Sequence, residues 1–116
     1  MKVQSYKNLI VWQKSMDLVV SIYTITSHFP KNEMYALSSQ MQRAAVSIPS
    51  NIAEGSRRKT KKDTVHFWTI AFGSGSELET QIEIIKRLPF GKNISFEKAD
   101  SLLEEIMKML NKMIYY

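Results

Sequence analysis

Apolar residues recur every three or four positions in four long segments of the chain. In the first segment, residues 9–29, this spacing is carried by Leu18, Ile22, Ile25 and Phe29. Such spacing gathers apolar side chains on one face of an α-helix. No stretch alternates with the period of two that a half-buried strand would need. The pattern therefore predicts helices and no sheet.

The other three predicted helices cover residues 33–54, 60–87 and 96–114. With about 20 residues each, helices of this kind are about 30 Å long. The links between them are only a few residues long, and short links favour antiparallel neighbours. We therefore expect an all-α fold, an antiparallel up-and-down four-helix bundle that forms a single domain over residues 1–116.

Four residues are candidates for marking the helix ends. Asn32 and Ser95 precede the second and fourth segments and are plausible N-caps, and Thr60 forms a T-x-x-D start signal with the residue three positions later. Gly55 follows the second segment, where a glycine in the left-handed conformation often ends a helix.

Proline and glycine interrupt two of the predicted helices. Pro49 lies inside the second one, where its ring removes a backbone donor and crowds the carbonyl of Ala45, so we expect a kink. The alternative is a true break, with Pro49 near the start of a new helix. Gly73 and Gly75 in the third helix each cost about 1 kcal/mol relative to alanine. A helix that tolerates this cost usually gains a close approach to a neighbour.

Composition places the chain among ordinary globular proteins. At 116 residues it can bury a single core, and it has no cysteine for disulfides or thiolate metal sites. Residues 1–15 lack the apolar core of a signal peptide. No stretch reaches the roughly 18 apolar residues of a membrane span. These features predict a cytoplasmic protein.

Positive charge is concentrated in one place. The chain has 16 Lys and Arg against 11 Asp and Glu, a formal net charge of +5, and residues 57–62 (RRKTKK) contain five of the cations. The remaining residues hold 11 basic and 11 acidic side chains, so the net charge equals that of this basic segment. A local cluster of this kind favours a polyanionic partner, most often nucleic acid.

Three phrases of the sequence resemble the four-helix bundle protein family, also called the 23S rRNA intervening-sequence protein family. They are YKNLIVWQKS at 6–15, ALSSQMQRAAVSIPSNIAEGSRR at 36–58 and IAFGSGSELETQ at 70–81. The resemblance spans roughly residues 6–90, and the middle phrase is highly specific. Beyond residue 90 the fourth helix matches only in pattern.

The resemblance implies an antiparallel four-helix bundle that assembles as a ring-shaped homopentamer. Some members of the family are encoded within rRNA intervening sequences. Related accessory proteins of diversity-generating retroelements bind nucleic acid and a reverse transcriptase. For most members no biochemical role is established.

A second group of polar residues shares one face of the second helix. Arg43, Ser47, Asn51 and Glu54 are spaced i, i+4, i+8 and i+11. A catalytic interpretation would make Glu54 a base and Arg43 an anion clamp. A structural interpretation is favoured, because Pro49 leaves a carbonyl without its usual donor and buried polar groups need partners. Ser47, Asn51 and Glu54 are thus expected to form a structural polar network, with Arg43 and Glu54 pairing to Glu77 or Gln81 across either a helix or a subunit interface.

The sequence offers no support for catalysis or for a cofactor. Di-iron bundles use two Glu-x-x-His motifs, whereas this chain has only Asp63-x-x-His66 and an unrelated His28. Glu77, Glu79 and Glu83 fit a solvated or pairing face. No phosphate-cradling glycine loop follows a strand. We expect no metal, no cofactor and no enzymatic activity.

The apolar faces of the first and fourth helices are wider than a narrow bundle seam requires. The fourth helix is also crowded with Met107, Met109 and Met113, for which filling of the core is the default interpretation. The extra width suits an interface between subunits.

The leading hypothesis is a non-enzymatic homo-oligomer that binds RNA or DNA through sequence-independent phosphate contacts. The residues expected to carry binding are Arg57, Arg58, Lys59, Lys61 and Lys62, with Arg43 and Arg87 as weaker additions. No aromatic stacking platform is interleaved with the cations, so no preference between RNA and DNA follows. The alternative is a protein–protein adaptor or scaffold whose cations dock an acidic or reverse-transcriptase-like partner.

Overall fold

The computed structural model describes residues 5–116 of the chain, apart from the side chain of Met34. Residues 1–4, which belong to the N-terminal segment assessed for a signal peptide, lie outside the described residues. Four α-helices dominate the described part: α1 (Ile10–Thr26), α2 (Ser39–Ser56), α3 (Lys61–Arg87) and α4 (Glu97–Tyr115). Short helical turns flank them: η1 (Tyr6–Asn8), η2 (Lys31–Glu33), the π-helical η3 (Met34–Ser38) and η4 (Pro89–Asn93).

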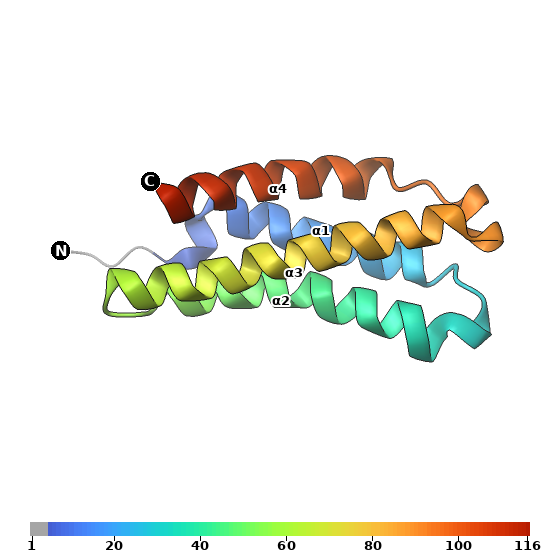
Figure 1. Ribbon diagram of the computed structural model, residues 1–116, viewed down its shortest axis with the longest axis horizontal. Coiled ribbons are helices and arrows are strands. Elements are labelled where there is room, and N and C mark those ends of the chain that lie inside the picture. Colours follow the sequence, from blue (N-terminus) through green and yellow to red (C-terminus); the bar gives the residue numbers. More distant parts are fainter. Residues whose placement is uncertain (1–4) are drawn as a thin grey trace.

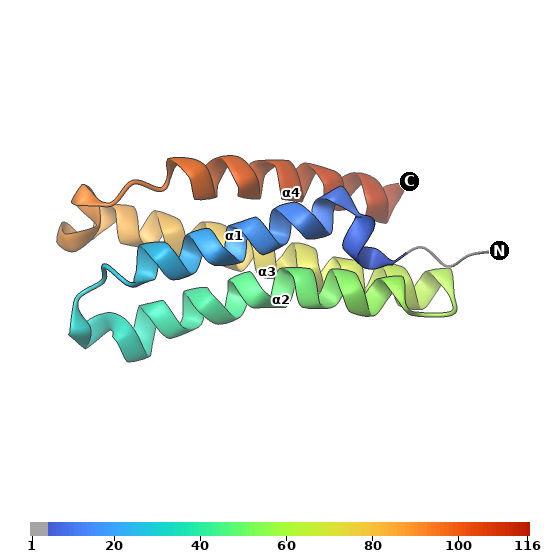
Figure 2. The ribbon, with the colours of Figure 1, turned by 180° about the vertical axis from the view of Figure 1, so that it is seen from behind.

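The four helices lie side by side and alternate in direction (Figures 1 and 2). Each packs on two neighbours, since α1 and α3 both contact α2 and α4. The resulting rod measures 52 × 22 × 22 Å. The predicted antiparallel up-and-down bundle is confirmed. The α2–α3 connection lies at the same end of the rod as the C-terminal end of α4 (Figure 1).

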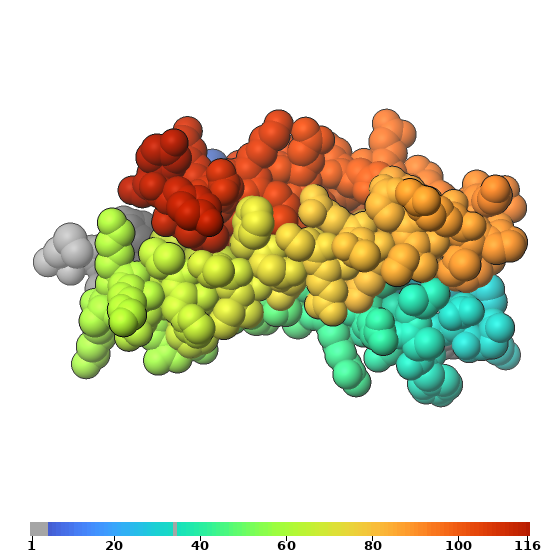
Figure 3. All heavy atoms as spheres, in the orientation of Figure 1, coloured from blue at the N-terminus to red at the C-terminus, as the bar shows by residue number. Residues whose placement is uncertain are grey.

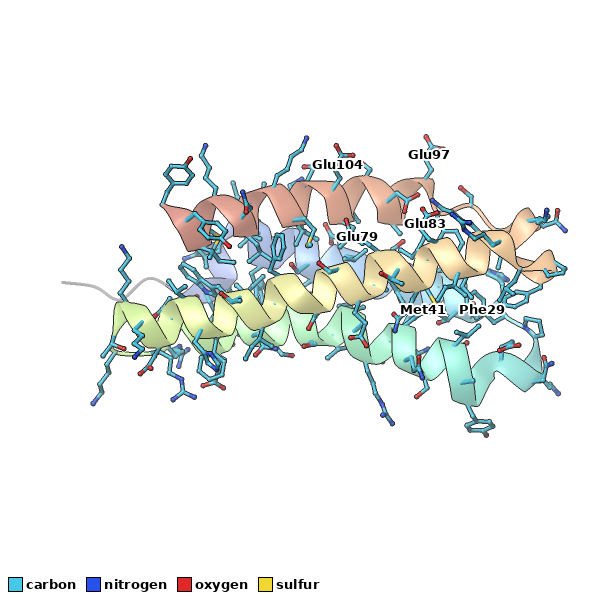
Figure 4. The ribbon with its side chains drawn as sticks, viewed as in Figure 1. Phe29, Met41, Glu79, Glu83, Glu97 and Glu104 are labelled. Atoms are coloured by element: carbon cyan, nitrogen blue, oxygen red, sulfur yellow. The ribbon has the colours of Figure 1, made fainter. Side chains whose placement is uncertain are left out.

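One apolar core runs along the axis of the bundle. All four helices contribute side chains with at most 2% of their surface exposed, such as Leu18, Ile48, Ile82 and Leu103. Phe29 and Met41, which Figure 4 labels near one end of the rod, are also buried. Burial of each large apolar side chain contributes about 1.5–3 kcal/mol. The core therefore accounts for the arrangement that the apolar spacing predicted.

The ends of the helices agree only partly with the predicted caps. Thr60 is the N-cap of α3, and its Oγ1 accepts a hydrogen bond from the backbone N of Asp63 at 3.1 Å. Asn32 is wrong as an N-cap, because it lies inside η2 and the second α-helix begins only at Ser39, after the π-helical turn. Ser95 lies one residue before the N-cap position of α4 and accepts only a long 3.4 Å bond from the N of Glu97.

The second helix continues through Pro49 without a break. The alternative of a new helix starting near Pro49 is therefore wrong. Gly75 fits the expected close approach, since a Cβ there would overlap the Met107 side chain of α4. Gly73 does not, because a Cβ there would have no heavy atom within 4 Å.

Of the two helices expected to expose surplus apolar surface, α1 exposes more large apolar side chains than α4. Ile10, Met16, Val20 and Tyr23 of α1 are between 40% and 64% exposed. In α4 the large apolar side chains before Tyr115 are buried or half-buried, because they pack on the core. Most of the apolar stripe of α4 therefore packs inside the monomer.

Lys86 links α3 to α4, and replacing it should weaken the fold in a pH-dependent way. Its Nζ lies 2.7 Å from Asp100 Oδ2 and 3.5 Å from Glu83 Oε1. The hydrogen bond to Asp100 raises the pKa of Lys86 above its ordinary 10.5. A raised pKa stabilises the fold below the ordinary value, and this contribution is lost as the pH rises through the folded-state value.

We expect Lys86→Gln to lower the free energy of unfolding at neutral pH by about 0.5 kcal/mol, since the pair is partly solvated. In urea titrations the difference from the unchanged protein should shrink as the pH rises above 10.5. Lys108→Gln, which removes an exposed pair within α4, is the control and should have little effect. If the difference in the free energy of unfolding stayed the same at high pH, the stabilisation could not be assigned to the charge of Lys86.

Candidate nucleic-acid interface

The basic segment is held at the end of the rod by a tight junction between α2 and α3. Gly55 is buried in the last turn of α2, and a Cβ there would lie 2.8 Å from Trp68 Cδ1 and 2.9 Å from the carbonyl oxygen of Thr64. The indole N–H of Trp68 faces the carbonyl oxygen of Ile52 at 3.4 Å. The predicted left-handed C-cap at Gly55 is wrong, since no residue in the described part of the chain has positive φ. Gly55 instead permits close contact between the helices.

Both arginines of the basic segment lie on aromatic rings. The guanidinium carbon of Arg57 is 5.2 Å from the centroid of the Tyr6 ring, and that of Arg58 is 4.6 Å from the centroid of the Phe67 ring. Cation–π contacts of this kind contribute about 0.5–1 kcal/mol at exposed sites. Arg58 also donates to Glu54, with Nη2 2.6 Å from Oε2. The two guanidinium groups are therefore held in place by neighbouring side chains.

The three lysines of the basic segment project into solvent. Lys59, Lys61 and Lys62 are exposed, and within residues 5–116 no carboxylate lies within ion-pair distance of them. Figure 3 shows the side chains of this segment (light green) extending beyond the body of the rod. All five cations thus lie at the end of the rod where α2 and α3 are joined, and we refer to them together as the basic surface.

The two weaker candidates lie elsewhere. Arg43 precedes Arg57 by 14 residues on α2, which corresponds to about 21 Å along a helix, and it lines a hollow with Ser74 and Glu77. Arg87 ends α3, roughly 40 Å along the helix from Lys61. Neither residue belongs to the surface formed by the basic segment.

The predicted polar network exists in part. It joins two helices, and its hydrogen bonds are not made to the carbonyl that Pro49 leaves without a donor. Asn51 Nδ2 donates to the Ser47 carbonyl at 2.8 Å and to Ser47 Oγ at 3.0 Å. Ser47 Oγ in turn lies 2.7 Å from Ser74 Oγ on α3. These bonds tie α2 to α3 across the bundle.

Glu54 is not a member of this network. Its ion pair is with Arg58, four residues along the same helix, and the predicted pairing of Arg43 or Glu54 with Glu77 or Gln81 is not among the ion pairs of residues 5–116. Gln81 is buried, and its Oε1 has no hydrogen-bond partner there. The carboxylate of Glu54 therefore belongs to the edge of the basic surface.

The rings beneath the arginines were not predicted from the sequence. Phe67 lies nine positions after Arg58, and an antiparallel pair joined by a short link brings such positions together, so this contact had a detectable signal. Tyr6 had none, because it comes from η1, about 50 residues earlier in the chain. Its ring also packs edge-on against Trp12, with 5.5 Å between the centroids.

Several exposed acidic side chains line the α3–α4 side of the molecule. Glu79 and Glu83 on α3 and Glu97 and Glu104 on α4 are exposed, and Figure 4 shows them along the α3–α4 side. Glu77 is exposed as well. Between residues 5 and 116 no group of three or more His, Asp or Glu side chains is placed to hold a metal ion. None of the helices described combines the length and apolar character that a membrane crossing requires.

Comparisons with known proteins agree with this fold. The model of the 23S rRNA-intervening sequence protein family matches residues 7–112. A crystal structure of a protein with unknown function from the S23 ribosomal protein family of Bacteroides thetaiotaomicron VPI-5482 is similar, with a TM-score of 0.80 and 25% sequence identity. The alignment covers 92% of this chain and 100% of that one. No curated protein matches the sequence.

Proposed function

Because the chain belongs to the 23S rRNA-intervening sequence protein family, we propose that it is a non-enzymatic, homo-oligomeric bundle that binds RNA or DNA. Binding takes place through phosphate contacts of the basic segment and needs no particular base sequence. The observation that carries the proposal is the surface of five cations at one end of the rod, three of which have no carboxylate partner among residues 5–116.

Phosphate contact suits the chemistry of these side chains. Arg57 and Arg58 keep free N–H donors that match a phosphate in two-pronged fashion, while the lysines act as mobile point charges. Each neutralised phosphate also releases condensed counterions, which makes the free energy of binding favourable at low salt. The surface therefore fits a polyanion better than a single acidic side chain.

Assembly multiplies the effect of a weak surface. The exposed apolar side chains of α1, together with Val46 of α2, supply an area for contact between subunits, and the family resemblance points to a homopentamer. Several copies of the basic segment in one particle would raise the overall affinity for a long polyanion by avidity. Light scattering on the eluted peak of a gel-filtration column measures the mass, and a monomer would contradict this part of the proposal.

The direct experiment is fluorescence anisotropy with a labelled structured RNA and a labelled DNA duplex. We expect binding at about 50 mM salt that weakens by roughly 500-fold at about 200 mM, if five phosphates are contacted. Absence of binding at low salt would contradict the proposal. In that event co-purification of a discrete polypeptide would favour the adaptor function, in which the same cations dock an acidic partner.

Removing the carboxylate beside Arg58 should strengthen binding. Glu54→Gln frees one guanidinium donor and takes a negative charge away from the surface, so we expect an affinity about 2- to 5-fold higher, corresponding to an exposed ion pair. Glu104→Gln is the matched control, because it makes the same charge change at an exposed i,i+4 pair on α4. Equal affinities of the two variants would show that Glu54 does not border the binding surface.

A further inference from the structure

Each arginine of the basic segment lies on a ring supplied by a different element. Tyr6 belongs to η1 and lies under Arg57, whereas Phe67 belongs to α3 and lies under Arg58. The rings themselves have aromatic neighbours: Tyr6 packs against Trp12, and Phe67 against His66 with 5.2 Å between centroids. Both rings are half-buried. The arginines therefore lie on fixed supports and not on mobile side chains.

A supported guanidinium loses less freedom on binding than a solvated one. A free arginine side chain has many rotamers, and immobilising it opposes association. When a ring holds one flat face, the planar edge with its N–H donors still points outward and can bind a phosphate. The ion pair of Arg58 with Glu54 is made through Nη2, 2.6 Å from Oε2, and a guanidinium carries five N–H donors in all.

We propose that Tyr6 and Phe67 are positioning residues that orient Arg57 and Arg58 toward phosphodiester groups of a nucleic acid. This inference rests on the proposed function and deepens it. The ligand is the sugar–phosphate backbone and not the bases, since each ring is half-buried and a guanidinium covers it. Arg57 and Arg58 thus form the ordered part of the surface, and Lys59, Lys61 and Lys62 form its mobile part.

The test separates positioning from charge. A Tyr6→Leu/Phe67→Leu variant keeps all five cations, so the slope of log K against log[salt] should stay unchanged. The affinity should fall by about 5- to 30-fold, because binding must then order two arginine side chains that the rings no longer hold. An Arg57→Gln/Arg58→Gln variant should lower the magnitude of the slope by about two. Tyr6→Phe keeps the ring and should bind like the unchanged protein. Anisotropy with the same labelled duplex measures all three.

A second readout needs no nucleic acid. In the unchanged protein the rings should shift the Nε–Hε resonances of Arg57 and Arg58 in an NMR spectrum, and the leucine variant should lose these shifts. If Phe67→Leu disturbs α3, the single variant Tyr6→Leu, in the peripheral turn η1, provides the same comparison for Arg57 alone. Leucine variants that bind as tightly as the unchanged protein would overturn the inference and leave the proposed function intact. Absence of binding by the unchanged protein would overturn the proposed function and, with it, this inference.

Discussion

Replacing Arg57, Arg58, Lys59, Lys61 and Lys62 by glutamine is expected to weaken nucleic-acid binding by about 100-fold or more at low salt. Electrostatic contacts supply essentially all of the affinity in sequence-independent binding, and these five side chains are the cations of the proposed surface. All five are exposed and lie outside the apolar core. The fold should therefore persist, which circular dichroism checks alongside the anisotropy measurement.

A charge-matched variant separates position from net charge. Glutamine at Lys31, Arg87, Lys92, Lys98 and Lys108 also lowers the formal net charge from +5 to 0, but these exposed residues lie outside the basic segment. Its affinity should fall far less than that of the first variant. It also removes Arg87, one of the two weaker candidates. If both variants lost affinity equally, binding would follow total charge and no local surface could be assigned.

Gly91→Ala is expected to lower the free energy of unfolding by about 3 kcal/mol. Gly91 is buried in the turn between α3 and α4, and a Cβ there would overlap the carbonyl oxygen of Ile85 and lie 2.7 Å from its carbonyl carbon. These are backbone atoms at the end of α3, so no side-chain rotation relieves the contact. Overpacking of this kind typically costs about 1–3 kcal/mol, and more where the backbone must move. Urea titration measures the change.

Gly73→Ala is the control, because it makes the same substitution with the opposite expected sign. Gly73 is exposed in the middle of α3 with open space around its Cα. Alanine is favoured over glycine in a helix by about 1 kcal/mol, so stability should rise. A Gly91→Ala protein as stable as the original would mean that the turn adapts easily and that the close approach carries little energy.

The arrangement of the helices was predictable because a repeated signal encodes it. Leu18 and Ile22 recur with the spacing of a buried helix face, and the short links leave antiparallel neighbours as the simplest packing. Thr60 was predictable as a cap because its signal is local and lies three residues from its partner. Features fixed by neighbours in sequence were thus within reach of sequence analysis.

Features fixed by tertiary contacts were not. From the sequence, a glycine near a helix end is equally consistent with a left-handed cap and with a close contact between helices. The position of Trp68 on α3 shows that Gly55 makes a close contact. Asn32 failed as a cap because η2 and the π-helical turn precede α2. The sequence alone did not show which apolar side chains of α4 lie in the core and which lie on the surface, because this depends on contacts such as that of Met107 with Gly75.

The candidate site shows the same division. The five cations were evident as a run in the sequence, but the side chains that contact them depend on the fold. Phe67 and Glu54 reach Arg58 because α2 and α3 are antiparallel and because helix positions four apart are neighbours. Tyr6 reaches Arg57 only because η1 lies at the end of α2. Long-range contacts of this kind leave no periodic trace in the chain.

The salt dependence of binding tests the central claim most directly. The measurement is the anisotropy-derived association constant for a DNA duplex over a range of salt concentrations, for the unchanged protein and for the variant with glutamine at residues 57, 58, 59, 61 and 62. We expect a slope of log K against log[salt] of about −4 to −5 for the unchanged protein and near zero for the variant. Equal slopes for the two proteins would contradict it, because the basic segment would then contribute no phosphate contacts.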